Sequence, residues 1–451
     1  MKISKTSCLV LTLTFSALMA GAAGADPARL GAELTPMGAE RAGNAAGTIP
    51  AWTGGIATPP DGYVAGQKHA DPFAGEAVLY AVDASNMDQH AAHLTEGQKA
   101  MMRAHGSYRL NVYPTRRSCA YPQAVYDAVK HNAEHARLVA DGNSVEGARM
   151  ASPFPIPTEA KHVIWNHILG YRGHKSTMQV AAAAPTSGGS YTLVQSSDRR
   201  IVNYTDPALG DIGELNNVES KWIRVNTAPA QQAGSAFLFH NTINQKVQER
   251  FGWIYSPQNR RVVAAARSAY DAPIPGTENL RFSDMQFMYN GAPDLYDWTL
   301  EGKREILTPY NTYKLSSGDF SYAEILQPGH LNPEAVRYEL HRVWVVDGRL
   351  KEGQRHQFHR RTLYVDEDTW MIVQTDLYGA DGQIARAQEA YVQNYYEVPF
   401  CAMDAEIAYD FASGRYHVQQ LKAQEPAPNY HAEDLKDDDF TPAALRRLVV
   451  R

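Results

Sequence analysis

The stretch that decides the fold is YVDEDTWMIVQTDLYGADGQIA, residues 364–385, in which short acidic segments interrupt apolar ones. Asp and Gly recur at two places, in DEDT at 366–369 and in ADGQ at 380–383. Asp side chains bond to nearby backbone groups and Gly adopts positive φ, so both residue types favour tight turns. We therefore interpret the stretch as strands joined by two turns.

Clustered carboxylates can also hold a metal ion or act as a catalytic pair. A twelve-residue calcium loop needs oxygen ligands at alternating positions, Gly at the sixth and Glu at the twelfth. With Gly382 as the sixth residue, the first and third would be Leu377 and Gly379, so the calcium pattern fails. Spacing alone leaves a glycosidase-type carboxylate pair open, but the turn interpretation is favoured.

Strand-like segments continue on both sides of this stretch, from about residue 173 to residue 421. They are short, rich in aromatic and β-branched residues and separated by turn sequences, without intervening helices. Such a run predicts an antiparallel meander. In chain order the clearest segments are MQVAAAAP, SYTLVQ, FGWIYSPQNRRVVAAAR, YELHRVWVVDGRL, RHQFHRRTLYV, TWMIVQTDLY, QIARAQEAYVQNYY, AEIAYDF and GRYHVQQL.

Three helices are predicted before the strands, at about residues 95–169. The first, in LTEGQKAMMRAHG, begins with a capping box of Thr95 and Gln98. The second begins at Pro122 and ends at Gly142, and the third, in TEAKHVIWNHILGY, has apolar residues at helical spacing. The chain therefore combines a small helical part with a larger β part.

The N-terminus has the pattern of a cleaved secretory signal peptide, residues 1–25. Lys2 and Lys5 precede an apolar segment, and Ala23-Gly24-Ala25 forms a small-residue cleavage site. The apolar segment is shorter than the roughly 20 residues that span a bilayer. We therefore expect a protein exported to the periplasm, either soluble or associated with the outer membrane.

The remaining segments flank one predicted domain at residues 95–421. Residues 26–94 are rich in Gly, Pro and Ala and show no long amphipathic period, which predicts an extended, loop-rich segment over the domain. Residues 422–451 form an acidic tail that contains EDLKDDDF and a short helical sequence, PAALRRL.

Charge and cysteine content narrow the class of protein. The formal net charge is −6 and basic clusters are missing from the sequence, which argues against a nucleic-acid partner. A hydrophobic share of 44% is typical of a packed globular protein. Cys119 and Cys401 remain after cleavage, and in the oxidising periplasm we expect them to form a disulfide.

The pattern HNAEH, with His131, Glu134 and His135, matches the H-x-x-E-H motif of inverted zinc peptidases. Residues i and i+4 share one helical face, so both imidazoles could reach one Zn²⁺ with Glu134 as base. The flanks are polar, however, and the region that follows offers only Glu214 and Glu219 as distant third ligands. We favour a solvated helix face and assign no metal, with a zinc-dependent hydrolase as the alternative.

Other enzyme signatures are weak. His341, His356 and His359 fall near neighbouring predicted strands, but His356 and His359 would face opposite sides of a strand. The sequence has no G-x-S-x-G elbow, no phosphate-binding Gly loop and no CxxC pair. We expect no catalytic activity and no cofactor.

Large aromatic residues recur in the predicted strands. In a closed sandwich they would form the core, whereas in a sheet curled into an incomplete barrel they would line a cavity for an acyl chain or another hydrophobic molecule. The candidate ligand-binding residues are Trp222, Phe237, Phe239, Trp253, Tyr255, Trp298, Trp344, Trp370 and Tyr378.

Long blocks of this sequence resemble a bacterial family named for its domain of unknown function 1329. That family is similar to the outer-membrane lipoprotein carriers LolA and LolB, so the resemblance implies a curved antiparallel sheet, an unclosed barrel, with helices over the opening. HNAEH belongs to none of the blocks. They are LTPMGAERAGNAAGTIPAWTGG, YPTRRSCAYP, PFPIP with WNH, YDWTLEGKREILTPYNTY, YELHRVWVVDGRLKEGQRH, RRTLYVDEDTW, DLYGADGQIARAQEAY and GRYHV.

The resemblance also implies a role and partners. It suggests a periplasmic, non-catalytic carrier or chaperone for a hydrophobic, lipid-like ligand. A resistance-nodulation-division type exporter in the inner membrane and a β-barrel protein in the outer membrane are the implied partners. A structural adaptor that bridges membrane partners without a ligand is a further alternative.

Overall fold

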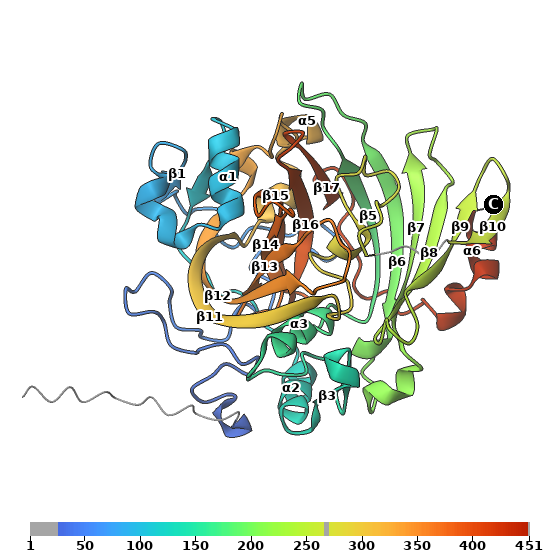
Figure 1. Ribbon diagram of the computed structural model, residues 1–451, viewed down its shortest axis with the longest axis horizontal. Coiled ribbons are helices and arrows are strands. Elements are labelled where there is room, and N and C mark those ends of the chain that lie inside the picture. The colour runs from blue at the N-terminus through green and yellow to red at the C-terminus, as the bar shows by residue number, and fades with distance from the viewer. Residues whose placement is uncertain (1–25, 266–269, 450–451) are drawn as a thin grey trace, which may run out of the picture.

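A computed structural model describes residues 26–265 and 270–449, and its main feature is one large curved sheet (Figure 1). The predicted signal peptide lies outside the described residues. The sheet has 15 strands, and its end strands β1 and β10 do not pair with each other, so the sheet is unclosed. This is the architecture that the sequence predicts.

The strands follow the predicted meander, with β11 placed beside β12 outside the main order. All neighbours in the large sheet are antiparallel except β2 and β12. In spatial order the strands are β1 (Tyr80–Val82), β2 (Leu110–Val112), β12 (Tyr338–Leu350), β13 (Arg360–Asp366), β14 (Ile372–Tyr378), β15 (Ile384–Tyr395), β16 (Phe400–Asp410), β17 (Arg415–Leu421), β5 (Lys175–Ala183), β6 (Val194–Val202), β7 (Val218–Ala228), β8 (Ala236–Thr242), β9 (Phe251–Ser256) and β10 (Arg261–Ala264), with β11 (Tyr296–Pro309) on β12.

The opening acidic stretch folds as predicted. One turn joins β13 to β14, where the Trp370 N–H donates to Asp366 O at 2.9 Å. A second joins β14 to β15, where the Gly379 N–H donates to Gln383 O at 2.9 Å and Gly382 has a φ of 74°. Both turns of the sequence interpretation are therefore confirmed.

Helices α1 (Glu96–Ala104) and α3 (Ala160–Ile168) lie where the sequence predicts them, and the Thr95–Gln98 capping box is present. The second helix is shorter than predicted, since α2 ends at His135 rather than near Gly142. The chain then forms a small hairpin of β3 (Arg137–Val139) and β4 (Ser144–Glu146), whose ladder takes the backbone groups that a longer helix would use. The remaining helices are α4 (Tyr313–Ser316), α5 (Tyr322–Ile325) and α6 (Pro442–Val449).

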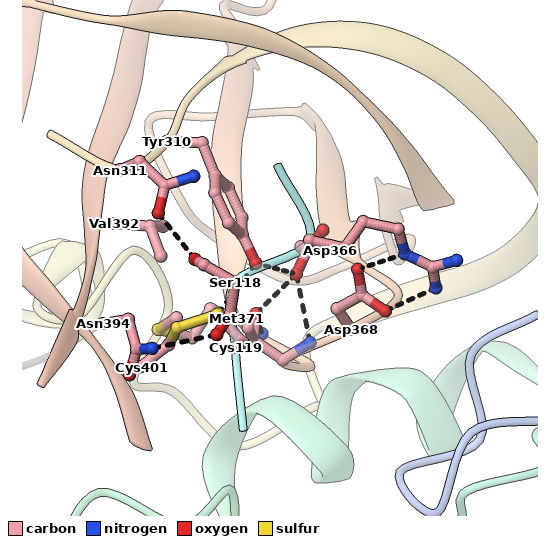
Figure 2. Close-up of a disulfide and its surroundings, with 12 residues drawn as sticks. Ser118, Cys119, Tyr310, Asn311, Asp366, Asp368, Met371, Val392, Asn394 and Cys401 are labelled. Atoms are coloured by element: carbon pink, nitrogen blue, oxygen red, sulfur yellow. Dashed lines mark hydrogen bonds and ion pairs between the residues drawn. A yellow bond between two sulfur atoms is a disulfide. The ribbon is translucent and has the colours of Figure 1, made fainter. Parts of the chain in front are cut away.

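The disulfide between Cys119 and Cys401 is present, with Cα atoms 5.6 Å apart (Figure 2). It joins the segment before α2 to β16 across a sequence separation of 282 residues. The predicted pairing is confirmed.

We divide the sheet into a packed arm, β11–β17, and an open arm, β5–β10. The linker between β10 and β11, described from residue 270 to 295, lies between the two arms. Its Asp284 accepts from Arg361 on β13 at 2.8 Å, and its Ser283 Oγ accepts from Arg250 beside β9 at 2.5 Å. Because it touches both arms, the linker lies on the concave side of the sheet.

The convex side of the open arm is covered by the C-terminal segment. Ile223 and Leu238 form a core cluster there with Phe440 and with Leu445 of α6. Figure 1 shows α6 outside β8–β10. The acidic tail predicted from the sequence is thus a structural part of the domain.

Candidate functional site

The acidic turn between β13 and β14 brings three possible metal ligands together. His341, Asp366 and Asp368 offer ligand atoms that all lie within 4.8 Å of one another, and within residues 26–265 and 270–449 this is the only such group. All three residues are buried. Figure 2 shows Asp366 and Asp368 beside the disulfide.

Charge pairing already satisfies most of this cluster. Asp368 accepts two hydrogen bonds from Arg117, at 2.9 and 2.6 Å. Asp366 Oδ2 accepts from the Thr369 N–H and hydroxyl at 3.0 and 2.8 Å. Burial and the nearby Asp368 raise the pKa of Asp366, which favours the neutral acid. A cation would have to displace Arg117, so we interpret the cluster as an internal network that secures the turn.

The HNAEH helix does not assemble a metal site. His131 and His135 stack with ring centroids 4.2 Å apart, and the His135 ring bonds to His131 O at 2.8 Å. Glu134 and His135 are exposed, and neither joins a three-ligand group in the described part of the chain. Glu134 and His135 therefore lie on an exposed part of α2.

The other histidines are separated from one another. His341 bonds to Glu339 at 3.2 Å; burial opposes its charged form, but Glu339 and Asp366 outweigh burial and raise its pKa. His356 lies 3.3 Å from Asp284, and His359 is exposed. His356 and His359 lie in the loop before β13 rather than in a strand, which corrects the expected placement.

The nine candidate aromatic residues do not line one cavity, in contrast to the sequence expectation. In the packed arm, Trp370 is 0% exposed and stacks on Trp344, and Trp298 packs against the same core cluster. Tyr378 is buried beneath the Arg360 guanidinium, 4.8 Å from its ring centroid. These four residues are occupied by internal packing.

The other five candidate aromatic residues are in the open arm, where some lie on the convex face and some on the concave face. Trp253 and Tyr255 belong to the convex cluster under α6. Ile223 of β7 and Leu238 of β8 belong to the same convex cluster, and side chains alternate along a strand, so the residues on either side of them in the chain face the linker. Only Trp222, Phe237 and Phe239 therefore lie together on the concave face.

Strand register arranges this concave face in two rows across β6–β9. One row pairs Arg200 with Trp222, Trp222 with Phe239, and Phe239 with Gly252. A Cβ on Gly252 would lie 2.5 Å from the Phe239 ring, so glycine makes room for that ring. The other row contains Asp198, Arg224, Phe237 and Ile254.

The aromatic members of these rows are half-buried and join none of the core clusters found among the described residues. Trp222 and Phe239 stack with ring centroids 5.9 Å apart. The Arg224 guanidinium lies 4.8 Å from the Trp222 ring centroid. Among the described residues, these rings therefore form an ordered, half-buried aromatic row outside the core clusters.

Two arginines meet one aromatic ring at the β6 end of the first row, and the sequence interpretation missed this arrangement. The guanidinium carbon of Arg200 lies 5.2 Å from the ring centroid of Phe287 in the linker, and that of Arg172 lies 5.5 Å from the same centroid. The sequence offered no signal for it, because SSDRRIV reads as an ordinary polar strand and the linker had no assigned structure.

Over the packed arm, linker residues fill the concave side, so the expected cavity is not open there. Phe282 and Met285 of the linker pack on Leu377 of β14 and so fill the space over the packed arm. Two cavities lie elsewhere in the described part of the chain. One, of about 200 Å³, is lined by Leu138 and Phe154 near α2 and α3, and the other, of about 10 Å³, lies by Lys68 and Lys422.

Of the helices in the described ranges, none combines the length and the apolar character needed to cross a bilayer.

One family model matches most of this chain. A family model described as "Protein of unknown function (DUF1329)" matches residues 81–446. An uncharacterized protein of Pseudomonas aeruginosa is 42% identical over 449 residues, 99% of this chain and 98% of that protein.

Solved structures with a similar arrangement have low sequence identity. A DUF1329 family protein from Desulfovibrio piger has a TM-score of 0.41 and 14% identity, covering 60% of this chain and 92% of its own. A putative outer membrane lipoprotein-sorting protein domain from Vibrio parahaemolyticus has a TM-score of 0.41 and 11% identity, covering 61% and 92%. A LolA superfamily protein from Nitrosomonas europaea has a TM-score of 0.38 and 12% identity, covering 63% and 98%.

Proposed function

The chain belongs to the DUF1329 family, and we propose that it is a periplasmic, non-catalytic carrier of a lipid-like molecule whose apolar chain binds on the concave face of the open arm. The observation that supports this proposal is the half-buried row of Trp222, Phe237 and Phe239, which lies outside the core clusters of the described residues. The same strands bury their other face under α6, so the two faces differ in how fully they are packed.

Apolar burial supplies the driving force for such a carrier. Covering apolar surface gains about 25 cal/mol per Å². The affinity for an acyl chain on these rings would therefore come mainly from the apolar area that the chain covers. The chain would lie on an open surface beside the linker rather than in a closed cavity. Release then needs no lid, although a partner that competes for the chain would speed it.

A non-catalytic role fits the state of the polar groups. The acids and histidines of the buried cluster by the disulfide are engaged with arginines and with each other. The histidines of α2 are on an open helix face. Neither arrangement presents a nucleophile with a general base to a bound substrate.

We extend the proposal to the partners that the family resemblance implies. A resistance-nodulation-division type exporter would deliver the ligand at the inner membrane, and an outer-membrane β-barrel protein would receive it. Co-purification of either partner with the tagged protein from membranes tests this extension, and absence of both from crosslinked samples contradicts it.

The carrier proposal is tested with a fluorescent fatty acid and purified protein without residues 1–25. We expect saturable uptake, reduced about tenfold when Trp222 and Phe239 are both changed to Ala. Tyr80→Ala is the matched control, because Tyr80 is 40% exposed at the opposite edge of the sheet. Absence of uptake, together with lipid-free native mass spectra of protein from periplasm, would leave an exported adaptor as the explanation.

A further inference from the structure

We infer that Arg172 and Arg200 form a head-group site for the carboxylate of a single-chain fatty acid, whose chain then lies over Trp222 and Phe239. The inference rests on the proposed carrier function and specifies the ligand of that site. It comes from the charge and register of residues that the sequence interpretation did not identify.

Two guanidinium groups without carboxylate partners meet at one place. The Arg172 and Arg200 guanidinium carbons lie 5.5 and 5.2 Å from the Phe287 ring centroid. In the described part of the chain, neither arginine has an acidic group within ion-pair distance. The neighbouring Arg224, by contrast, is neutralised by Asp198 through two bonds of 2.8 and 2.7 Å.

The hydrogen-bonding state of these arginines also leaves donors free. Arg172 donates to His167 O at 2.5 Å, but its Nε is buried without a partner. Among the described residues, the Arg200 side chain makes no hydrogen bond. Its guanidinium lies against the Phe287 ring, and its charged neighbours Glu219 and Asp198 lie beyond ion-pair distance. Burial, followed by the charge of Arg200, lowers the pKa of Arg172 to about 10, although Glu219 and Glu406 act in the opposite direction. A bound anion would lower the free energy of this charged, buried pair.

The ring between the two arginines is held in place. His167 donates from Nε2 to Phe287 O at 2.8 Å and accepts from the Ile372 N–H at Nδ1, at 3.0 Å. Burial, with Arg172 nearby, lowers the pKa of His167 to about 3, so the imidazole stays neutral in this role. Phe287 is therefore anchored through its carbonyl.

The backbone on the other side of the ring is anchored as well. Phe287 and Met288 have φ of 51° and 68°, a conformation that non-glycine residues seldom adopt. Glu406 accepts both of their N–H groups, at 3.4 and 3.1 Å, and pairs with Arg281 at 2.7 Å. Strained backbone that surrounding contacts maintain is often found at ligand clamps.

Register places the head-group site at the end of the aromatic surface. Arg200 is directly opposite Trp222, which is opposite Phe239. Two strand spacings separate Arg200 from Phe239, roughly 10 Å. The cationic end of this surface suits the head group of a fatty acid, and the single row of aromatic rings suits one acyl chain. The planar guanidinium fork matches the two oxygens of a carboxylate.

The experiment compares ligands that share a chain and differ in the head. Binding of dodecanoate, dodecanol and dodecyl phosphate is measured by calorimetry on the full mature protein. We expect dodecanoate to bind most tightly, and Arg200→Gln to weaken it about tenfold, as loss of a charge-assisted hydrogen bond does. Arg200→Lys keeps the charge without the fork and should retain part of the affinity.

Arg199→Gln is the matched control, because Arg199 precedes Arg200 and pairs with Ile223 of the convex face. It should leave dodecanoate binding unchanged, and thermal unfolding confirms that each variant is folded. Equal affinity for dodecanol and dodecanoate, unaffected by Arg200→Gln, overturns the head-group site and leaves the carrier function. Tighter binding of dodecyl phosphate overturns the carboxylate assignment. Failure of all three ligands to bind overturns the carrier function itself.

Discussion

The two arms of the sheet differ in how they use their faces. Every residue of β14 is buried, because Asp376 meets α1 on one face while Leu377 meets the linker on the other. In β7 the buried positions recur only at intervals, and Trp222 is left half-exposed on the concave side. A strand covered on both faces contributes to stability, whereas a strand covered on one face has a surface available for a ligand.

The disulfide belongs to the packed arm, so its removal tests how much that arm depends on covalent support. Changing both Cys119 and Cys401 to Ala should lower the free energy of unfolding by up to about 5 kcal/mol, since the bond closes a long loop in the unfolded chain. Urea unfolding with and without reductant measures this. Reductant should affect the natural protein and leave the double variant unchanged; a loss below about 1 kcal/mol would contradict the entropic argument.

Two tryptophans compare the arms directly. Trp370→Ala should cost about 4 kcal/mol, because the side chain is fully buried and its Nε1 donates to Met37 O at 2.7 Å. Trp222→Ala should cost less than about 1 kcal/mol, because the ring is outside every core cluster of the described residues. Chemical unfolding measures both, and equal losses would show that the concave face is core rather than a binding surface.

A buried carboxyl group of the packed arm, Glu389, should make the stability of the protein depend on pH. Burial raises the pKa of Glu389 from 4.5 to about 7, although Tyr338 donates to it at 3.0 Å. Between these pH values the folded protein keeps a proton that the unfolded chain has released. Stability from this group is therefore full below about pH 4.5 and is lost as pH rises through 7.

Glu389→Gln, which cannot ionise, isolates this contribution. The stability of the variant relative to that of the natural protein should rise by roughly 3 kcal/mol when the pH is raised from 5 to 8. Denaturant unfolding at the two pH values measures the difference. Glu33→Gln is the control, because its side chain is 73% exposed. A pH-independent difference for Glu389→Gln would mean that the carboxylate is not desolvated in the folded state.

A further, small effect is expected at the helix that covers the packed arm. Thr95→Ala removes the capping box of α1 and should cost about 1 kcal/mol. Hydrogen exchange of the first turn of α1 should rise while exchange in β7 stays the same. Equal changes in both places would show that the arms unfold as one unit.

Much of the fold was predictable because its signals are local. The turns at Asp366 and Gly382, the capping box at Thr95 and the disulfide each depend on a few neighbouring residues or on the compartment. The length of α2 was overestimated, since the hairpin after His135 competes for the same backbone groups. The candidate site was predictable only in part. Trp222, Phe237 and Phe239 were identified among nine aromatic residues of similar local sequence.

The sequence by itself determined the strand-rich domain, its turns and its cysteine pair, because alternation, turn chemistry and capping act over a few residues. Only the tertiary structure decided which face of each strand is covered. Trp253 lies under α6, which is nearly two hundred residues away in the chain, while Trp222 is half-buried outside the core clusters of the described residues. The meeting of Arg172, Arg200 and Phe287 likewise joins three distant segments. Coverage and charge pairing depend on contacts between remote parts of the chain, and local patterns carry no information about them.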